Sequence, residues 1–414
     1  MKNLLVTALF IFLATPALAD RPNIVLFIAD DIGYHELGSF GGPATPNIDA
    51  IAGAGLTFTD FYATPFCTPT RADVQTGRYH QRTGLNSALG YLSSTGLPSS
   101  EVTMAEQLRT NGYATALVGK WHLGRQDAFH PNRQGYDYFF GFRGGEGDYF
   151  THRTNYGSAY IDWWRNSTFL PTVEYSTWAY TREANAFVNR TTQPFFMVIS
   201  YQAVHTPIQS PSDTDGGNHL EHRRETIAAM DASIGDITRK LPPNTVVFFM
   251  SDNGGSPLDG GSNFPLRGGK GSVYEGGVRV PMIVKGPGVV RGTRTTVLAA
   301  IDLFPTIMRL TGTSLPAVRL DGVDFSPVLR GTGGIPARRL FWTQHANWAV
   351  RSGRWKLDCV NGALGLYDLR VDIGERRNLA GARPDVVSRL HTAFDVWKAD
   401  VTRGHPLSTS CASQ

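Results

Sequence analysis

Residues 23–31 read NIVLFIADD, an apolar run that ends on two adjacent aspartates. A continuous apolar run of this length predicts a strand that is covered on both faces, as in the sheets of α/β proteins. Two more runs have the same form: FFMVIS at 195–200 leads to AVHTP at 203–207, and TVVFFM at 245–250 leads to SDNGG at 251–255. Each predicted strand therefore leads into a polar, histidine-bearing or glycine-rich loop.

The segments between these runs have the periodicity of helices. Residues 101–112 end on Asn-Gly, a frequent helix stop, and residues 225–241 place four apolar side chains on one stripe before two prolines. Strands that alternate with helices predict an α/β fold, in which a large, mostly parallel mixed sheet is covered by helices on both faces. Ligands bind beyond the carboxyl ends of such strands. We therefore gather into one candidate site the residues Asp30, Asp31, His205, Asp252 and Asn253.

The sequence changes character after the glycine-rich residues 331–334. Short strand-like pieces follow at 340–342, 348–351, 355–357 and 364–367, and a helical pattern runs from about 384 to 398. We expect a smaller C-terminal antiparallel sheet with one helix. The predicted organisation is a signal peptide at 1–19, a main domain at 20–335 and a C-terminal α+β subdomain at 336–414.

The N-terminus has the three parts of an export signal. Lys2 gives a positive start, residues 4–13 are apolar, and Ala17-Leu18-Ala19 forms a cleavage site of small residues. An uncleaved membrane anchor is the alternative, but a membrane span needs about 20 apolar residues. We expect cleavage before Asp20, an exported protein that is periplasmic or secreted, and no stable membrane association.

Composition limits the class of the protein. Of its 414 residues 41% are hydrophobic and 18% are charged, which fits a folded chain rather than a disordered one. The net charge is only +4 and there is no run of Lys and Arg, so we expect no nucleic-acid partner. The cysteines leave two arrangements open: Cys359 and Cys411 form a disulfide and leave Cys67 alone, or all three are separate thiols.

Two pairs of oxygen-bearing side chains follow predicted strands. Asp30 and Asp31 follow the first run, and Asp252 and Asn253 follow the third. Adjacent carboxylates cannot both be buried without a positive partner, and oxygen ligands suit Ca²⁺ or Mg²⁺ rather than zinc. Either pair alone is more often a loop start or a helix N-cap than a metal site. Both pairs together, at strand ends of one sheet, favour a metal site.

The segment CTPTR at 67–71 carries the candidate nucleophile. Pro69 restricts the local backbone, and Arg71 lies four residues from the sulfur of Cys67. A guanidinium near a thiol lowers its pKa and suits an anionic ligand. An isolated motif of this kind would by default be a buried cysteine in a turn.

Further cationic residues occur in glycine-containing segments. Lys120 and His122 are two apart in the sequence GKWHLG, so on an extended chain they face the same side. His205 precedes Thr-Pro at a strand end, and Lys270 lies in the sequence RGGKG. Each residue alone has an ordinary structural explanation. Together with Arg71 and a metal, they supply the positive charge that a tetrahedral anionic ester group requires.

In chain order, the segments resemble the type I sulfatases of the alkaline-phosphatase-like superfamily over nearly the whole mature chain. The matching segments are PNIV at 22–25 with the aspartates at 30–31, TPNID at 45–49, CTPTR at 67–71 with TGR at 76–78, GKWHLG at 119–124, VHTP at 204–207, SDNG at 251–254, and GGKG at 268–271 with EGG at 275–277. One position departs from the pattern, because Gln75 stands where the family usually has an apolar residue.

The resemblance implies hydrolysis of sulfate esters. It implies that Cys67 is oxidised to Cα-formylglycine by a formylglycine-generating or sulfatase-maturing enzyme. The hydrate of that aldehyde is then expected to attack sulfur, displace the alcohol and afterwards release sulfate. One Ca²⁺ is implied, with the ligands Asp30, Asp31, residue 67, Asp252 and Asn253.

The same resemblance implies roles for five cationic residues by their positions. His122 is expected to assist the release of sulfate. His205 and Lys270 are expected to protonate the leaving oxygen, and Arg71 and Lys120 to stabilise the diol and bind sulfate charge.

The substrate class is implied by a narrower resemblance. The segment GFRGGEGDYFTH at 141–152 resembles the arylsulfatase B, or N-acetylgalactosamine-4-sulfatase, group. This resemblance implies a sulfated saccharide from a glycosaminoglycan or an algal polysaccharide. Four aromatic residues either stack on sugar rings or pack in the core: Trp163, Trp164, Trp178 and Tyr180.

Two other functions remain open. A phosphonate or phosphodiester hydrolase of the same superfamily would share the fold, although those enzymes tend towards transition metals and more histidine ligands. A non-catalytic binder of sulfated glycans would result if Cys67 were not matured.

Overall fold

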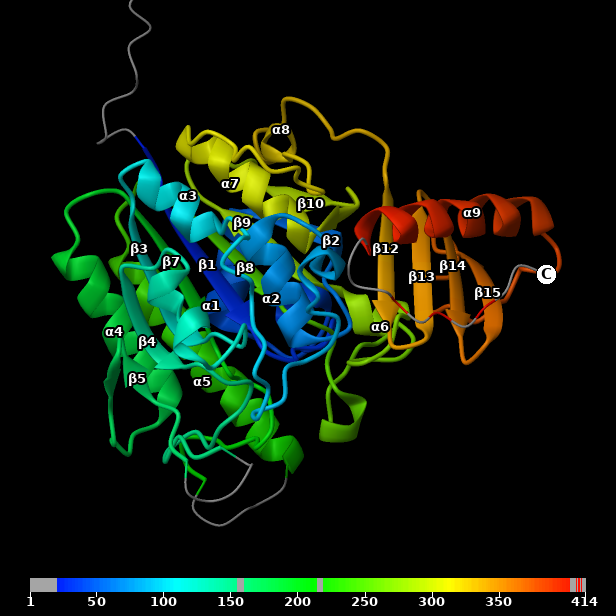
Figure 1. Cartoon of the computed structure of the whole chain (residues 1–414). Coiled ribbons are helices and arrows are strands. Elements are labelled where there is room, and N and C mark those ends of the chain that lie inside the picture. The colour runs from blue at the N-terminus through cyan, green and yellow to red at the C-terminus, as the bar shows by residue number, and fades with distance from the viewer. Residues whose placement is uncertain are drawn as a thin grey trace, which may run out of the picture.

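The three apolar runs form neighbouring parallel strands of a large sheet (Figure 1). They are β1 (Asn23–Ala29), β7 (Phe195–Ser200) and β8 (Thr245–Ser251). The computed structural model describes residues 21–154, 160–213 and 219–402 together with residues 407, 409 and 411, so the predicted signal peptide at 1–19 lies outside the described residues. The other described strands of this sheet are β2 (Leu56–Tyr62), β3 (Ala114–Lys120), β4 (Tyr138–Phe142), β5 (Trp164–Arg165), β6 (Thr168–Phe169), β9 (Arg279–Lys285), β10 (Gly292–Arg294) and β11 (Leu298–Ala299).

The order of the strands confirms the predicted sheet. Within the described residues the 11 strands follow the order β10-β2-β9-β8-β1-β7-β3-β4-β5-β6, and β11 pairs with β2. The strands β8, β1, β7, β3 and β4 are parallel to their neighbours in this series. Strand β9 is antiparallel to both β2 and β8, which makes the sheet mixed. The fold is therefore α/β with a mostly parallel centre.

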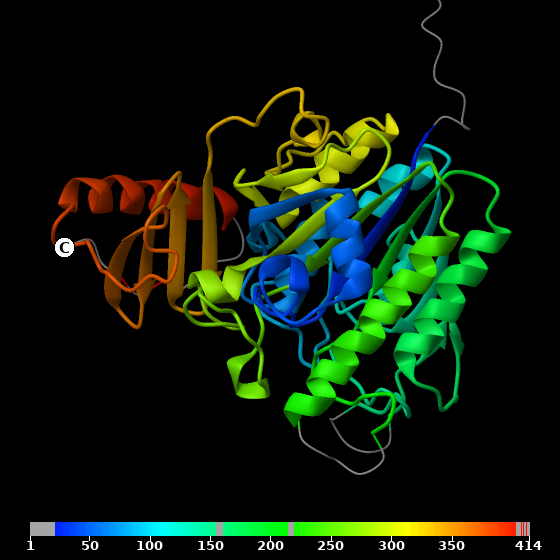
Figure 2. The ribbon, with the colours of Figure 1, turned by 180° about the vertical axis from the view of Figure 1, so that it is seen from behind.

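Helices cover both faces of this sheet (Figure 1, Figure 2). In the described part of the chain they are α1 (Pro46–Ala54), α2 (Cys67–Thr76), α3 (Met104–Thr110), α4 (Ser176–Arg190), α5 (His219–Lys240), α6 (Glu275–Val278), α7 (Leu303–Thr311) and α8 (Ser326–Leu329). Buried side chains of α2, α3 and α7 share one core with the sheet, and those of α1, α4 and α5 share the other.

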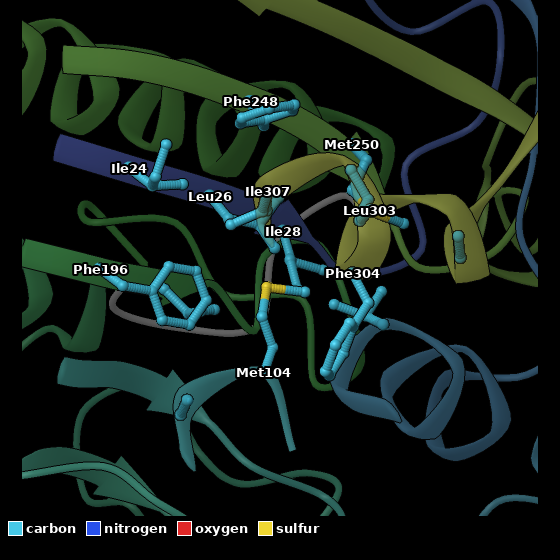
Figure 3. Close-up of a cluster of buried hydrophobic side chains, with 14 of the residues drawn as sticks. Ile24, Leu26, Ile28, Met104, Phe196, Phe248, Met250, Leu303, Phe304 and Ile307 are labelled. Carbon is cyan, nitrogen blue, oxygen red and sulfur yellow. The ribbon is translucent and has the colours of Figure 1, made fainter. Parts of the chain in front are cut away.

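The first of these cores is drawn in Figure 3. Side chains alternate along a strand, so Ile24, Leu26 and Ile28 of β1 all point into this core. Met104 of α3 and Phe304 of α7 close it from the helical side. The intervening residues of β1 face the second core, which explains why the whole run is apolar.

Two helices differ in extent from the sequence prediction. Helix α3 begins at Met104 rather than at 101, because Thr103 caps it. The Thr103 hydroxyl accepts the backbone N–H of Glu106 at 3.1 Å, and the Glu106 carboxylate accepts the N–H of Thr103 at 2.8 Å. Helix α5 begins at His219, ahead of the predicted start at 225.

The C-terminal residues form the predicted antiparallel sheet with one helix, beside the large sheet in Figure 1. Its elements are β12 (Arg339–Gln344), β13 (Asn347–Ser352), β14 (Trp355–Val360), β15 (Ala363–Asp368) and α9 (Pro384–Val401). Cys359 of β14 forms a disulfide with Cys411, which leaves Cys67 as the free cysteine. The boundary at 335 falls between α8 and β12 and remains a prediction.

Buried polar contacts join the two sheets. Trp342 of β12 donates from Nε1 to the carbonyl of Ala63 at 2.8 Å. Lys356 of β14 lies 2.9 Å from the carboxylates of both Glu275 in α6 and Glu375. Because Ala63 leads towards the start of α2, the small sheet borders that helix. Among the described residues no helix combines the length and the apolar character that crossing a membrane requires.

Candidate active site

Two parallel strands deliver the predicted acidic residues to one point. Strand β1 leads into Asp30 and Asp31, and the neighbouring β8 leads into Asp252 and Asn253. The side chain of Asn253 donates from Nδ2 to Oδ1 of Asp31 at 2.7 Å, and the N–H of Asp31 donates to Oδ1 of Asp252 at 3.3 Å. The cluster lies beyond the carboxyl ends of the strands, where the sheet prediction placed it.

Each of the three buried carboxylates has a cation beside it. The nitrogen–oxygen distances are 2.5 Å for Lys120 and Asp30, 2.7 Å for Lys270 and Asp31, and 2.8 Å for Arg71 and Asp252. Three positive charges therefore offset three negative charges. A divalent cation would add the net positive charge that an anionic substrate needs.

Two oxygen atoms of this cluster face no donor. Asp30 Oδ1 and Asn253 Oδ1 are buried and have no hydrogen-bond partner among the described residues. An unpartnered buried oxygen costs about 1–3 kcal/mol, and Ca²⁺ binds carboxylate and amide oxygens of this kind. Ligand atoms of Asp30, Asp31 and His205 also lie within 4.8 Å of one another. The carboxylate and amide oxygens of this cluster therefore fit a calcium ion as ligands.

Burial and neighbouring charges shift the pKa values of these carboxyl groups in opposite directions. Burial raises the pKa of Asp252, and the neighbouring Asp30 raises it further. Burial also acts to raise the pKa of Asp31, but Lys270 and His205 outweigh it and hold that pKa well below its usual range. A bound divalent cation would favour the charged form of Asp252, as Lys270 and His205 do for Asp31.

Cys67 is the first residue of α2, and its thiol faces an imidazole. The Sγ atom lies 3.2 Å from Nδ1 of His122, and Nε2 of His122 lies 2.9 Å from the carbonyl oxygen of Leu89. A carbonyl oxygen only accepts, so Nε2 carries the proton of the neutral imidazole. The Nδ1 atom is then an acceptor directed at residue 67.

Burial favours the neutral forms of both Cys67 and His122. Burial, followed by the charge of Lys120, lowers the pKa of His122 well below its ordinary value. The sequence prediction of a lowered thiol pKa is wrong, because burial raises the pKa of Cys67 and outweighs the opposing effects of Lys120 and Lys270. The encoded thiol is therefore a protonated group rather than a reactive thiolate.

His122 does not continue the strand that carries Lys120. Strand β3 ends at Lys120, and His122 has a positive φ of 56°, so the prediction of an extended segment is wrong there. The imidazole of His122 packs closely against the backbone of Gly145, because a Cβ added at Gly145 would lie only 2.4 Å from the ring. Both side chains still reach the site, Lys120 at Asp30 and His122 at Cys67.

The guanidinium of Arg71 donates hydrogen bonds to three acceptors, one of which is in the acidic cluster. One terminal nitrogen donates to Ser200 Oγ at 2.5 Å and to the Lys120 carbonyl at 3.1 Å, and the other donates to Asp252. Ser200 was missed as a site residue, although it is a polar residue that closes an apolar run. The Leu89 carbonyl was also missed, and a backbone acceptor leaves no signal in the sequence.

His205 and Lys270 lie on the Asp31 side of the site. The Nδ1 atom of His205 donates to the carbonyl of Thr206 at 2.8 Å, and its Nε2 lies 4.0 Å from Asp31 Oδ2. Burial lowers the pKa of His205 to about 4. A backbone hydrogen bond joins the loop of Lys270 to the segment before α2: the N–H of Gly271 donates to the carbonyl of Pro65 at 2.9 Å.

The aromatic residues divide between the core and the surface. Trp163 and Tyr180 are fully buried, and the Trp163 ring stacks on His152 at 3.7 Å, so the sugar-stacking interpretation is wrong for both. Trp164 is half-buried beneath Arg143, whereas Trp178 of α4 is exposed.

Gln75, the residue that departs from the motif, is buried in α2. It exchanges hydrogen bonds with the hydroxyl of Tyr136, at 2.8 Å from Nε2 and 3.0 Å to Oε1. Its polarity is thus explained by a partner in the core.

The chain matches proteins of known family along most of its length. Residues 22–313 match the sulfatase family model. The chain is 35% identical to arylsulfatase A of Homo sapiens over 443 aligned residues, which cover 90% of this chain and 87% of that protein. It is also 35% identical to N-acetylgalactosamine-6-sulfatase of Sus scrofa, over 78% of this chain and 68% of that protein.

Solved structures are also similar to this chain along most of its length. The crystal structure of Ps i-CgsB in complex with k-i-k-neocarrahexaose is 31% identical, with a TM-score of 0.84 over 91% of this chain and 92% of that one. The PsFucS1 sulfatase from Pseudoalteromonas sp., at 23% identity, shares the fold with a TM-score of 0.81 over 94% and 91% of the two chains. The narrower resemblance to the arylsulfatase B group is not tested by these proteins and stays a prediction.

Proposed function

The chain belongs to the sulfatase family and is a sulfuric ester hydrolase, and from this premise we propose that it cleaves sulfate esters of sulfated saccharides. The proposed nucleophile is an oxidised Cys67, with one calcium ion beside it. The observation that carries the proposal is the contact between Cys67 and His122 at the N-terminus of α2. The charges of Asp30 and Asp252 act on Cys67, and Asp30 and Asn253 of the same cluster each carry an unpartnered buried oxygen.

Both proposed groups supply chemistry that the encoded side chains lack. Formylglycine at residue 67 would provide, as its hydrate, one hydroxyl to attack sulfur and a second to release sulfate afterwards. Calcium would be held by Asp30, Asp31, Asp252, Asn253 and residue 67, and would supply positive charge where negative charge develops. The encoded Cys67 thiol, whose pKa burial raises, does not meet the need for an oxygen nucleophile.

His122 is suited to accept a proton from residue 67. Its Nε2–H is committed to the Leu89 carbonyl, so Nδ1 is the acceptor that faces residue 67 at 3.2 Å from Sγ. Its low pKa keeps the imidazole neutral at physiological pH and able to take a proton. This role matches the expected assistance to sulfate release.

Of the two residues expected to protonate the leaving oxygen, His205 and Lys270, the lysine is suited to do so. A saccharide alkoxide is a poor leaving group, so its release is accelerated when a proton is supplied in the transition state. Lys270 carries that proton on Nζ, at 2.7 Å from Asp31, and the Nε2 of His205 lies on the same side. His205 is neutral because burial lowers its pKa to about 4, and its one N–H, on Nδ1, is bonded to the Thr206 carbonyl, so of the two residues Lys270 is the one that carries a proton to donate.

Arg71, Lys120 and the first turn of α2 are suited to stabilise the sulfate group. Arg71 and Lys120 are buried and fixed by ion pairs, so their charges need no rearrangement as the reaction proceeds. Residue 67 lies at the first position of the helix, where free backbone N–H groups and the helix dipole favour an anion.

A saccharide substrate is supported by the relatives. Ps i-CgsB was crystallised with a neocarrahexaose, and another relative is an N-acetylgalactosamine-6-sulfatase. Maturation by a formylglycine-generating or sulfatase-maturing enzyme, and export to the periplasm or medium, complete the proposal.

The test is sulfate release by protein co-expressed with a maturing enzyme. We expect turnover of p-nitrophenyl sulfate and of at least one sulfated saccharide among carrageenan oligosaccharides and N-acetylgalactosamine 6-sulfate. The Cys67→Ala variant should lose about 10⁴-fold or more of kcat/KM, whereas Arg370→Ser, on an exposed turn, should retain wild-type turnover. Faster cleavage of p-nitrophenyl phosphate than of the sulfate would instead assign the chain to the phosphoryl hydrolases.

Metal content is a separate test. Wild-type protein should contain about one calcium per chain by mass spectrometry of the metals, and Asp30→Ala should contain none while keeping its fold by circular dichroism. A transition metal in place of calcium would overturn the calcium assignment.

A further inference from the structure

A groove runs along strand β12 of the small sheet, and α9 forms one of its walls. Two cavities of about 700 and 780 Å³ share Arg339 and Phe341 in their linings, so they adjoin. Arg338 lines the first cavity, and Arg319 and Arg389 line the second. We call these two cavities together the arginine groove.

The arginine groove carries uncompensated positive charge. Its lining contains one carboxylate, Asp400, which already pairs with Arg82 at 2.6 Å and with Arg319 at 3.2 Å. Arg339 and Arg389 are exposed, and neither forms an ion pair with a carboxylate of the described residues. Two guanidinium groups are therefore free to bind an anion from solution.

The floor of the arginine groove is aromatic. Phe341 is half-buried, and its ring stacks on that of Trp397 at 4.8 Å with an interplanar angle of 7°. Trp397 is only 7% exposed, and its Nε1 has no hydrogen-bond partner among the described residues. A flat apolar ring beside guanidinium groups matches a ring-shaped ligand with anionic substituents.

Strand β12 separates the arginine groove from the catalytic centre. Arg339 is its first residue, and the turn at its other end brings His345 to 6.2 Å from Phe66, the residue before Cys67. A strand of this length spans roughly 20 Å at about 3.3 Å per residue. A small aryl sulfate at Cys67 therefore does not reach the arginine groove.

We propose that the arginine groove is a second binding site for a sulfated polysaccharide, which holds the polymer while Cys67 acts elsewhere on it. This inference rests on the proposed function for the class of polymer. Sulfate groups pair with Arg339 and Arg389, and the apolar face of a sugar ring packs on Phe341. The site contributes affinity for long chains and nothing to the chemical step.

The experiment compares two charge-matched double variants in the full-length, matured protein. Arg339→Ser with Arg389→Ser removes the free arginines of the groove. Arg370→Ser with Arg376→Ser removes two exposed arginines from the segment that follows β15, the edge strand of the small sheet opposite to β12. Binding is measured by affinity electrophoresis in gels containing κ-carrageenan, chemically desulfated κ-carrageenan or double-stranded DNA, and turnover is measured with p-nitrophenyl sulfate.

The proposal predicts that the groove variant binds κ-carrageenan about tenfold more weakly than wild type, because two charge-assisted contacts are lost. Its turnover of p-nitrophenyl sulfate should equal that of wild type, and the control variant should match wild type in both assays. Unchanged binding of κ-carrageenan by the groove variant, an equal loss in the control variant, or equally tight binding of DNA would each overturn the proposal. Failure of the proposed function is distinct, since wild type would then not release sulfate.

Discussion

The lysine buried between the two sheets gives the sharpest prediction about stability. Lys356 of β14 has no exposed surface and lies 2.9 Å from the carboxylates of Glu275 and of Glu375. Glu375 also accepts the backbone N–H of Glu275 at 2.7 Å. The perturbation is Lys356→Met, which keeps most of the apolar stem beside Trp342 and removes the charge.

The expected loss follows from leaving two buried carboxylates without their shared cation. Removing one partner of a buried ion pair costs about 3–5 kcal/mol, because the remaining charge is neither solvated nor paired. Glu275 retains Tyr62 and Arg279 as partners, so the uncompensated charge falls mainly on Glu375. Lys356→Met with Glu375→Gln should therefore recover about 2 kcal/mol or more of the loss.

The assay is urea unfolding followed by tryptophan fluorescence at pH 5 and pH 8. Burial raises the pKa of Glu375 even with Lys356 present, and without the lysine that pKa rises further. A carboxyl group with a raised folded-state pKa stabilises the fold at low pH, and this contribution is lost as the pH rises. The variant should thus be less destabilised at pH 5 than at pH 8. A loss below about 1 kcal/mol at pH 8, or a double variant no more stable than the single one, would refute this account.

Three further predictions concern single features. Burial raises the pKa of Asp358 to about 6, so the wild type loses stability as the pH rises from about 4 to 6. The Asp358→Asn variant should therefore be about 1–3 kcal/mol more stable than the wild type at pH 8 in urea unfolding. An Asp358→Asn variant that is no more stable than the wild type would contradict this prediction. Replacing Cys359 and Cys411 by Ala should lower the free energy of unfolding by about 2–4 kcal/mol, and an unchanged midpoint would count against a stabilising disulfide. Lys270→Ala should slow a saccharide sulfate by about 10²–10⁴-fold in kcat/KM but slow p-nitrophenyl sulfate, with its better leaving group, far less; equal losses would rule out proton donation.

The architecture of the large sheet could be predicted because its central strands are buried on both faces. The apolar run from Ile24 to Ile28 has no polar position, which identifies a strand between two helical layers. The start of α3 was misplaced although its signal was present, since Thr103 and Glu106 have the spacing of a capping box. The interface between the sheets was not predicted, because the partners of Lys356 are far apart in the chain.

The membership of the site was more predictable than its electrostatics. Asp30, Asp252 and Lys270 were gathered from strand ends and glycine-rich loops, and the structure brings them together. The direction of the shift in the pKa of Cys67 was wrong, because it depends on burial, which the local sequence does not contain. The orientation of His122 was equally inaccessible, since a backbone carbonyl and a positive φ set it.

We propose that residue 67 acts as formylglycine rather than as cysteine. The most direct measurement is the mass of the peptide that contains residue 67, taken from protein that releases sulfate. Conversion of the Cys67 thiol to an aldehyde should make this peptide lighter than the encoded one by about 18 Da, and the converted fraction should follow the turnover of p-nitrophenyl sulfate across preparations. A fully active preparation in which residue 67 carries only the unmodified thiol would contradict the claim.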